Sequence, residues 1–329
     1  MRLTHWWILL LFPSIVLADE PLLTIQILSK YHPQSLTVET RSRIFQLAHG
    51  VPPQFEFSAP VDQPMTITVG DLQRSYRGTI QVSWSGDEYV LKNITPIEMY
   101  VAGVVVGELG SQAEPELIKA QAILARTYAL KTRQRETLAD LAYHQVFHGF
   151  DHYAQSIYAI TRQTHDLVLM QDGRLADALY HAECGSAIYQ AGEFWRVDNY
   201  QVPIELPAGM TKGQPWQVFL TEAQLSAVFP KATQLSQLRT IPMMMDLGSE
   251  QRNIETFRLM INRKYGWNTI PSNEFDIQRQ SQGWLLQGHG RGHLVGLCQL
   301  QAGELAGQGL GYEQILGVFY PDLKLTSLP

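Results

Sequence analysis

Residues 115–130 read PELIKAQAILARTYAL and form the clearest helical pattern in the chain. Proline is favoured in the first turn of a helix, and alanine and leucine have high intrinsic helix propensity. Lys119 and Arg126 are seven positions apart, which places them two turns apart on one face of the predicted helix. These two cations either face solvent or point together toward a polar or anionic group.

The segments before this helix predict strands. Apolar and polar residues alternate over 22–28, 65–69 and 78–84, beside glycine, proline and aspartate turn signals. We therefore predict a small β-rich unit over residues 19–90. A turn and cap signature at 93–101 then predicts a short helix.

The segments after the helix predict a mixture of strands and helices. Residues 166–181 are typical of a β-hairpin turning at Asp172-Gly173, with Tyr180 and His181 at its end. Helices are predicted over 221–229 and 254–265. The fold class is therefore α+β, with mixed helices and antiparallel β-hairpins over residues 91–325.

Composition restricts the classes of function. The chain has 329 residues, of which 45% are hydrophobic and 17% charged, as in ordinary globular proteins. Its formal net charge is −6 and it has no run of basic residues, which argues against nucleic-acid binding. Two cysteines are too few for a disulfide-built scaffold or a four-cysteine zinc site.

The first eighteen residues indicate export. Arg2 supplies a positive charge, residues 6–17 are apolar, and Val16-Leu17-Ala18 has the small-residue form of a cleavage site. A bilayer span needs roughly 20 apolar residues, and this run is shorter. We therefore expect a cleaved signal peptide over 1–18, no stable transmembrane anchor, and a location in the periplasm or cell envelope.

Residues 288–299 read GHGRGHLVGLCQ and combine glycines with two histidines. The glycines give the backbone access to conformations that are closed to other residues. No Gly-Lys-Ser/Thr follows, so a phosphate cradle is not indicated. His289 and His293 are four positions apart and could bind a metal ion on a helix, but the glycines between them oppose a helix.

Glu108 is the one acidic residue in the apolar stretch over 104–110. Burial of a carboxylate there would raise its pKa, which suits a general acid that works near neutral pH. The alternative is a glutamate at a helix end that faces water. The residues themselves leave both interpretations open.

The order of these motifs resembles the SpoIID/LytB family, which comprises stage II sporulation protein D and amidase enhancers. The resemblance covers about residues 91–325 and leaves the N-terminal β-rich unit without a counterpart. The motifs that carry it are Glu108, the helix over 115–130, residues 180–185 (YHAECG), the glycine–histidine segment over 288–299 and residues 311–321.

The resemblance implies a lytic transglycosylase that cleaves peptidoglycan glycan strands, preferentially strands without stem peptides. Glu108 matches the catalytic acid of the family. It would protonate the glycosidic oxygen and then accept a proton from the sugar 6-hydroxyl as an anhydro ring closes. This route needs no second catalytic carboxylate, whereas a conventional glycosidase would need one, for which Glu183 and Asp177 are the candidates.

The resemblance also implies roles for other positions. Lys119 and Arg126 would bind polar groups of the sugar or hold Glu108 in place. Gln299 would be either a polar contact to substrate or a satisfied core amide. The predicted substrate-binding residues are Lys119, Arg126, Tyr180, His181, His293 and Gln299.

Two departures from the family pattern concern cysteine. Cys184 and Cys298 stand where the family usually has serine, in two segments expected to meet at the site. They would form a disulfide worth about 4 kcal/mol in an oxidising compartment, the alternative being two free buried thiols. Some members have a zinc site, but the matching stretch at 143–149 lacks cysteine. We therefore disfavour zinc and expect no cofactor.

Two other functions remain as alternatives. The same domain could bind glycan and stimulate a separate cell-wall amidase without cutting the strand. A metal-dependent amidase that uses His181, His289 and His293 is the weaker alternative, because their spacing matches no known ligand pattern on a helix. The expected partners are glycan strands and a cell-wall amidase.

Overall fold

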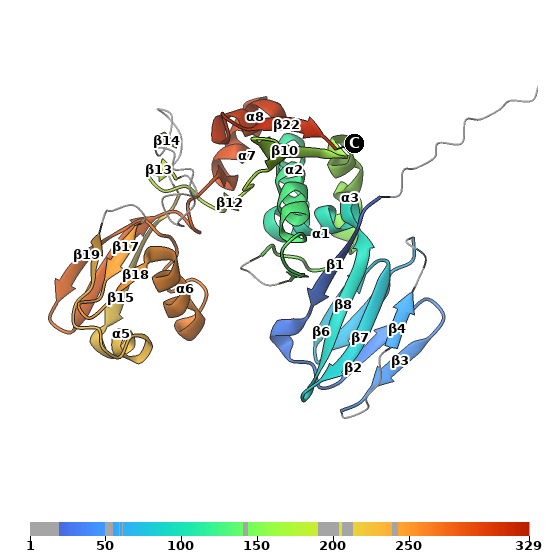
Figure 1. The fold of residues 1–329 in the computed structure, drawn as a ribbon, viewed down its shortest axis with the longest axis horizontal. Helices are drawn as coiled ribbons and strands as arrows, with labels where there is room; N and C mark the ends of the chain where they lie inside the picture. The colour runs from blue at the N-terminus through green and yellow to red at the C-terminus, as the bar shows by residue number, and fades with distance from the viewer. Residues whose placement is uncertain are drawn as a thin grey trace, which may run out of the picture.

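The computed structural model describes residues 20–49, 55–58, 60, 62–140, 144–189, 204–205, 213–238 and 243–328. The predicted signal peptide over 1–18 lies outside these residues. Within the described ranges, no helix is both long enough and apolar enough to cross a bilayer. Figure 1 shows two lobes on opposite sides of a central group of helices.

The N-terminal lobe consists of two sheets whose strands are antiparallel except for one short strand, in agreement with the alternating pattern of its sequence. One sheet has the order β4 (Phe55–Ser58), β7 (Thr79–Ser85), β8 (Glu88–Pro96), β1 (Leu22–Ile27), and then β9 (Leu138–Ala139), which pairs with β1 in parallel. The other has the order β3 (Ile44–Leu47), β2 (Leu36–Glu39), β5 (Met65–Val69) and β6 (Leu72–Tyr76). A 3-10 turn spans Ser29–Tyr31.

The β-rich lobe shares one hydrophobic core with the central helices. Strand β8 runs through the predicted boundary between residues 90 and 91, and the helix α1 follows it without a linker. Buried side chains such as Ile25 and Ile80 belong to the same cluster as Val101 and Ile118. The N-terminal strands therefore support the helix that positions Glu108.

The central helices are α1 (Ile97–Leu109), α2 (Pro115–Thr132) and α3 (His152–Thr161), followed by a 3-10 turn at Arg162–Thr164. Helix α2 confirms the strongest helical pattern and starts at Pro115, as expected. Helix α1 is longer than predicted, because the apolar residues 101–106 continue it and Gly110 ends it. Glu108 consequently lies in the last turn of α1.

The segment after the helices departs from the predicted hairpin. Strands β10 (Leu167–Gln171) and β11 (Arg174–Leu175) form the hairpin, but β11 ends at once. Tyr180 and His181 form a separate strand, β12 (Tyr180–His181), which pairs in parallel with β21 (Leu297–Cys298). The predicted hairpin over 166–181 is therefore wrong beyond Leu175, since β12 finds its partner more than 100 positions away along the chain.

Residues 213–238 and 243–290 form a lobe inserted between β12 and β21. It has its own hydrophobic core, and both helices predicted in this part of the chain, α5 and α6, are confirmed. Thr221 caps α5 through a complete capping box with Gln224. The elements of the lobe are β15 (Pro215–Thr221), α5 (Glu222–Val228), β16 (Ser236–Leu238), β17 (Met244–Asp246), β18 (Gln251–Asn253), α6 (Ile254–Tyr265), β19 (Phe275–Gln280) and β20 (Gly283–His289).

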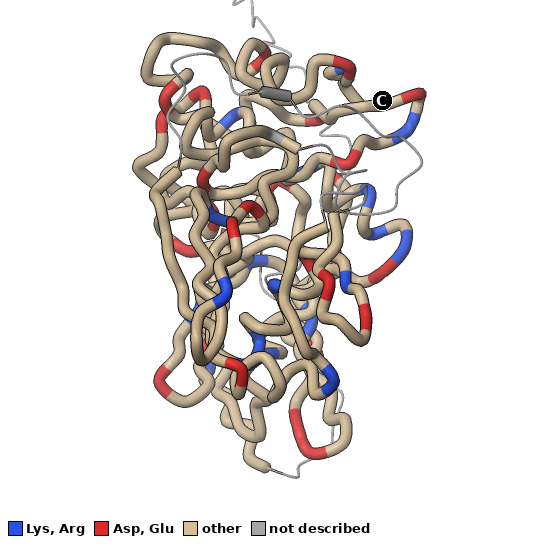
Figure 2. The backbone as a smooth tube through the Cα atoms, turned by 90° about the vertical axis from the view of Figure 1, so that its left-hand side faces the viewer, with Lys and Arg blue, Asp and Glu red and all other residues tan. Residues whose placement is uncertain are grey.

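The C-terminal elements cover α2. Helices α7 (Gln299–Gly307) and α8 (Tyr312–Phe319) pack against it, and β22 (Lys324–Ser327) pairs with β10. A short pair, β13 (Ala187–Ile188) with β14 (Ile204–Glu205), lies near the inserted lobe (Figure 1). In Figure 2, lysine and arginine positions are interspersed with aspartate and glutamate positions along the chain. The architecture as a whole is α+β, as predicted.

Candidate active site

Glu108 lines a cleft of about 540 Å³ between the central helices and the inserted lobe. Tyr128 and His144 contribute to the wall on the side of Glu108. On the opposite side lie Glu255 and Arg258 of α6, together with Trp267 in the loop that follows. The cleft is therefore built by segments that are far apart in the sequence.

The carboxyl group of Glu108 is held by two donors on the same oxygen. The backbone N–H of Val146 donates to Oε1 over 2.8 Å, and the hydroxyl of Tyr180 donates to Oε1 over 3.1 Å. Burial raises the pKa of Glu108 above its usual range, while these two hydrogen bonds lower it in part. A carboxyl group with a raised pKa at the wall of a cleft is suited to proton transfer near neutral pH.

Tyr180 belongs to a buried chain of polar groups behind Glu108. Gln145 donates from Nε2 to the Tyr180 hydroxyl over 3.1 Å, and Tyr100 donates to Oε1 of Gln145 over 3.1 Å. Burial and the nearby Glu108 carboxyl raise the pKa of Tyr180 well above its usual range. Tyr180 is therefore a neutral hydrogen-bond donor toward Glu108.

His181 and His293 line the cleft, His181 buried and His293 half-buried, and both are neutral. His181 donates from Nδ1 to the carbonyl of Val295 over 3.1 Å, and His293 accepts at Nδ1 from the N–H of Val295 over 3.0 Å. Burial lowers the pKa of each to about 3, with a smaller contribution from the neighbouring His293 at His181 and from the Arg258 charge at His293. Since His293 also donates to the backbone carbonyl of Tyr180, it fixes the strand that presents that residue.

The glycines of residues 288–299 allow two backbones to approach each other. A Cβ at Gly290 would lie 2.4 Å from the carbonyl oxygen of Cys184, and one at Gly296 would lie 2.1 Å from that of Leu179. Both glycines also have positive φ. In this structure the glycines thus serve the packing of the segment against residues 179–184, where β12 lies.

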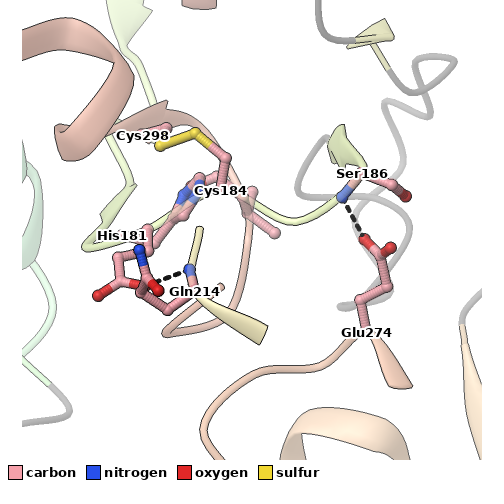
Figure 3. Close-up of a disulfide and its surroundings, with 8 residues drawn as sticks. His181, Cys184, Ser186, Gln214, Glu274 and Cys298 are labelled. Carbon is pink, nitrogen blue, oxygen red and sulfur yellow. Dashed lines mark hydrogen bonds between the residues drawn. A yellow bond between two sulfur atoms is a disulfide. The ribbon is translucent and has the colours of Figure 1, made fainter. Parts of the chain in front are cut away.

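Cys184 and Cys298 form a disulfide, with their Cα atoms 5.5 Å apart (Figure 3). Both side chains are fully buried. The bond links the segment after β12 to the start of α7. It therefore ties together the two motifs that meet at the cleft.

The predicted contact of Arg126 with the sugar has to be corrected. Its guanidinium donates from Nε and Nη2 to the two carboxyl oxygens of Glu98, each over 2.6 Å, and from Nη1 to the carbonyl of Leu167 over 3.0 Å. Only 1% of Arg126 is exposed, and it does not line the cleft. Arg126 therefore fastens α2 to α1 and β10 instead of contacting substrate.

Lys119 also lies away from the cleft, although it is on the same helix. Its ammonium pairs with Glu116 one turn earlier and lies 5.4 Å from the ring centroid of Tyr312 on α8. The expected contact of Lys119 with the sugar therefore has to be corrected. Gln299 does line the cleft, and its Nε2 donates to Oε1 of the buried Gln121 over 3.3 Å.

The carboxylates considered as partners of Glu108 are paired elsewhere. Asp177 accepts from Lys131 over 2.5 Å, and Glu183 accepts from the N–H of Gln214 over 3.0 Å. Neither lines the cleft. The second carboxylate at the cleft is Glu255, which forms an ion pair with Arg258 over 2.7 Å.

Sequence reasoning missed several residues of this site. Gln145 lies in the stretch over 143–149, where the family pattern draws attention only to a missing cysteine. Glu255, Arg258 and Trp267 lie in a part of the chain that resembles no motif. A signal existed for Glu255 and Arg258, because charged residues three positions apart on a predicted helix form an ion pair. That this pair faces the cleft depends on how the lobe packs.

The described residues include one group with the geometry of a metal site. The ligand atoms of His181, Cys184 and Cys298 lie within 4.8 Å of one another. The disulfide occupies both sulfur atoms, so this form offers only the imidazole as a ligand. His289, the third histidine of the amidase alternative, does not line the cleft.

Comparisons with known proteins agree with the motifs. A family model described as "Stage II sporulation protein" matches residues 85–171, which include Glu108, α2 and Gln145. An uncharacterized protein of Brachyspira hyodysenteriae is 25% identical over 270 residues, which cover 77% of this chain and 72% of that protein. The amidase enhancer of Bacillus subtilis is 24% identical over 283 residues, which cover 68% of this chain but 40% of the enhancer. These matches confirm the resemblance that the motifs indicate.

Proposed function

We propose, from the membership of this chain in the SpoIID/LytB family, that it is a peptidoglycan lytic transglycosylase in which Glu108 is the general acid and base. The family and the amidase enhancer relative link the chain to cell-wall remodelling. The observation that carries the finer proposal is the Glu108 carboxyl, which is half-buried at the cleft with a raised pKa and two donors on one oxygen.

The proposed reaction balances with one carboxyl group. Protonated Glu108 transfers its proton to the glycosidic oxygen, and the bond from that oxygen to the anomeric carbon breaks with its electron pair on the oxygen. The Glu108 carboxylate then accepts the proton of the sugar 6-hydroxyl, whose oxygen bonds to the anomeric carbon. Glu108 ends protonated, no water is consumed, and one product is an anhydro sugar.

The surroundings of Glu108 support an acid that begins protonated. His181 and His293 are neutral, and the charge of Glu255 is balanced by Arg258. Among the described residues, the hydrogen-bond donors to the Glu108 carboxyl are a backbone N–H and a phenol, and no cation forms an ion pair with it. With no cation paired to the carboxylate, burial keeps the pKa of Glu108 raised although the two hydrogen bonds lower it in part.

The test of this proposal is mass spectrometry of the products from peptide-free glycan strands. Wild-type protein should produce fragments that end in anhydro-muramic acid, and Glu108→Gln should lose at least about 99% of the activity, since general acid catalysis contributes roughly 10²–10⁴-fold. Glu183→Gln is the matched control, because it removes a carboxylate that does not line the cleft. Products with reducing ends would instead indicate hydrolysis and a role for Glu255.

A second candidate is favoured by one observation, the name of the Bacillus subtilis relative. In this case the chain would bind glycan and stimulate a cell-wall amidase without cutting the strand. Glu108→Gln would then retain both strand binding and stimulation. A folded wild-type protein that binds strands and releases no anhydro ends would favour this candidate over the transglycosylase.

We also propose that the protein is exported and acts in the periplasm or cell envelope on strands that lack stem peptides. The support for export is the sequence pattern of residues 1–18. A disulfide is typical of proteins in an oxidising compartment, which agrees with this location. N-terminal sequencing of the protein recovered from its cells should begin at Asp19.

A further inference from the structure

Tyr100 stands at the start of a hydrogen-bond chain that ends on Glu108. Its side chain is fully buried on α1 and does not line the cleft. From Tyr100 the chain runs to Oε1 of Gln145, then from Nε2 of Gln145 to the hydroxyl of Tyr180. The last link runs from that hydroxyl to Oε1 of Glu108, and each of the three links measures 3.1 Å.

With the Gln145 amide oriented as in the structure, the hydrogen-bond chain runs in one direction. A phenol has a single proton, and an amide accepts only at oxygen and donates only at nitrogen. Because Tyr100 donates to Oε1 of Gln145, the amide nitrogen must face Tyr180. Tyr180 accepts from that nitrogen, so its own proton is available for Glu108.

Rotation of the amide by 180° would reverse this arrangement. The amide oxygen would then accept the proton of Tyr180, and the amide nitrogen would face the hydroxyl of Tyr100. Glu108 would lose one of its two donors. Only 1% of Gln145 is exposed, so protein groups rather than bulk water decide between the two orientations.

The direction of the chain also determines which oxygen of Glu108 carries a proton. Oε1 accepts from both the N–H of Val146 and the hydroxyl of Tyr180. A protonated carboxyl group carries its proton on one oxygen, and two donors on Oε1 disfavour a third hydrogen there. The proton of the acid form therefore belongs on Oε2.

We propose that Tyr100 is a positioning residue that acts on Glu108 through Gln145 and Tyr180, and that it directs the transferable proton of Glu108 to Oε2. The role in catalysis rests on the proposed function, whereas the placement of the proton does not. Tyr100 contacts no substrate in this scheme. It sets the orientation of the Gln145 amide, and that amide sets the direction in which the Tyr180 hydroxyl donates.

Other titratable groups near Glu108 would not be changed by the removal of the Tyr100 hydroxyl. On the side of the central helices, Tyr128, His144 and His181 line the same cleft. On the other side are His293, the ion pair of Glu255 with Arg258, and Arg291. A change from tyrosine to phenylalanine at residue 100 alters none of these groups and adds no charge. A shift in the titration of Glu108 would therefore report on the hydrogen-bond chain.

The experiment measures the protonation of Glu108 directly, by infrared difference spectroscopy of its carboxyl band against pH. The band is identified by its loss in Glu108→Gln. Tyr180→Phe should raise the midpoint by about one pH unit, because a hydrogen bond to the charged form is lost. Tyr100→Phe should raise it by a smaller amount, since the freed amide populates both orientations.

The decisive sample is the double variant Tyr100→Phe/Tyr180→Phe. If Tyr100 acts only through Tyr180, the double variant should have the midpoint of Tyr180→Phe alone. Likewise, Tyr100→Phe should have no effect in a Gln145→Met background. Additive shifts in both pairs, or an unchanged midpoint in Tyr100→Phe, would overturn the proposal.

Tyr76→Phe is the matched control for removing a buried hydroxyl. Tyr76 is fully buried, and its ring packs against Phe147, as the ring of Tyr100 does, with centroid distances of 6.2 and 4.9 Å. Tyr76 has no place in the chain to Glu108, so this variant should leave the midpoint unchanged. A shift as large as that of Tyr100→Phe would mean that core packing, and not the chain, is responsible.

Turnover gives a second readout. The reaction requires protonated Glu108, so kcat falls as pH rises through its pKa, and a raised pKa moves this alkaline limb to higher pH. The limb should move in Tyr100→Phe with KM unchanged. Because the infrared midpoints need no turnover, a protein without glycan cleavage would refute the proposed function and leave the placement of the proton testable.

Discussion

Arg126 belongs to a family motif, but its side chain stabilises the packing of helices instead of contacting substrate. The helical spacing correctly places it on α2, and a cation near a proposed acid is a natural candidate for substrate binding. The structure instead gives it Glu98 as a buried partner through two short hydrogen bonds. Its role is to hold α1, and therefore Glu108, at a defined distance from α2.

This role predicts a large effect on stability. Arg126→Leu should destabilise the protein by about 3–5 kcal/mol, because Glu98 would remain buried without its partner. Urea denaturation of the purified variant measures this cost. The double variant Glu98→Leu/Arg126→Leu should recover much of the loss, since it leaves no unpaired charge. A stable Arg126→Leu protein with a raised KM would instead support the substrate-binding role.

At the scale of elements, the pair of β12 and β21 brings the motifs together. Each strand has two residues, so the backbone ladder by itself offers little stability. The disulfide between Cys184 and Cys298 and the close approach of the glycine backbone add to this pairing. Tyr180 can reach Glu108 because this short strand is held from both sides.

We therefore predict that the disulfide contributes to stability and to the geometry of the site. The bond links residues 114 positions apart, and a loop of this length corresponds to about 5 kcal/mol in the chain-entropy view. The variant Cys184→Ala/Cys298→Ala should lower the midpoint of chemical denaturation accordingly and weaken the Tyr180 contact.

Mass spectrometry after thiol labelling, with and without prior reduction, establishes the bond itself, because the two cysteines should be labelled only after reduction. The double variant is the control, because a reductant should not alter its denaturation midpoint. If full reduction left the wild-type midpoint unchanged, the disulfide would have no stabilising role.

At the scale of the whole molecule, the cleft exists because two separate units face each other. The central helices supply Glu108, and the inserted lobe supplies the opposite wall, seen in Figure 1 as separate parts of the fold. Trp267 stands at this cleft with 51% of its surface exposed. An exposed indole in a cleft is suited to contact the apolar face of a sugar ring.

This placement predicts that Trp267→Ala weakens strand binding without unfolding the protein. We expect a loss of about 1 kcal/mol or more, roughly fivefold in KM, with a smaller change in kcat. Phe219→Ala is the matched control, because Phe219 is another exposed aromatic residue of the same lobe that does not line the cleft. Equal effects of the two variants on KM would mean that Trp267 has no specific contact with the strand.

The features that depend on neighbouring residues can be predicted from the sequence. Helix α2 follows from its composition and from Pro115, and α5 and α6 follow from their caps and periodicity. The N-terminal strands follow from alternation, and Glu108 stands out as a lone acid in an apolar stretch. In each case, the residues that decide the feature lie within a few positions of one another.

The tertiary structure alone decided which of these residues meet. It pairs the strand residue Tyr180 with Leu297 and the Arg126 guanidinium with the Glu98 carboxylate. It places Gln145 between Tyr100 and Tyr180. It also places an inserted lobe opposite Glu108. Such contacts depend on how distant elements pack, and no spacing in one segment encodes them, because burial and partner choice are properties of the assembled core.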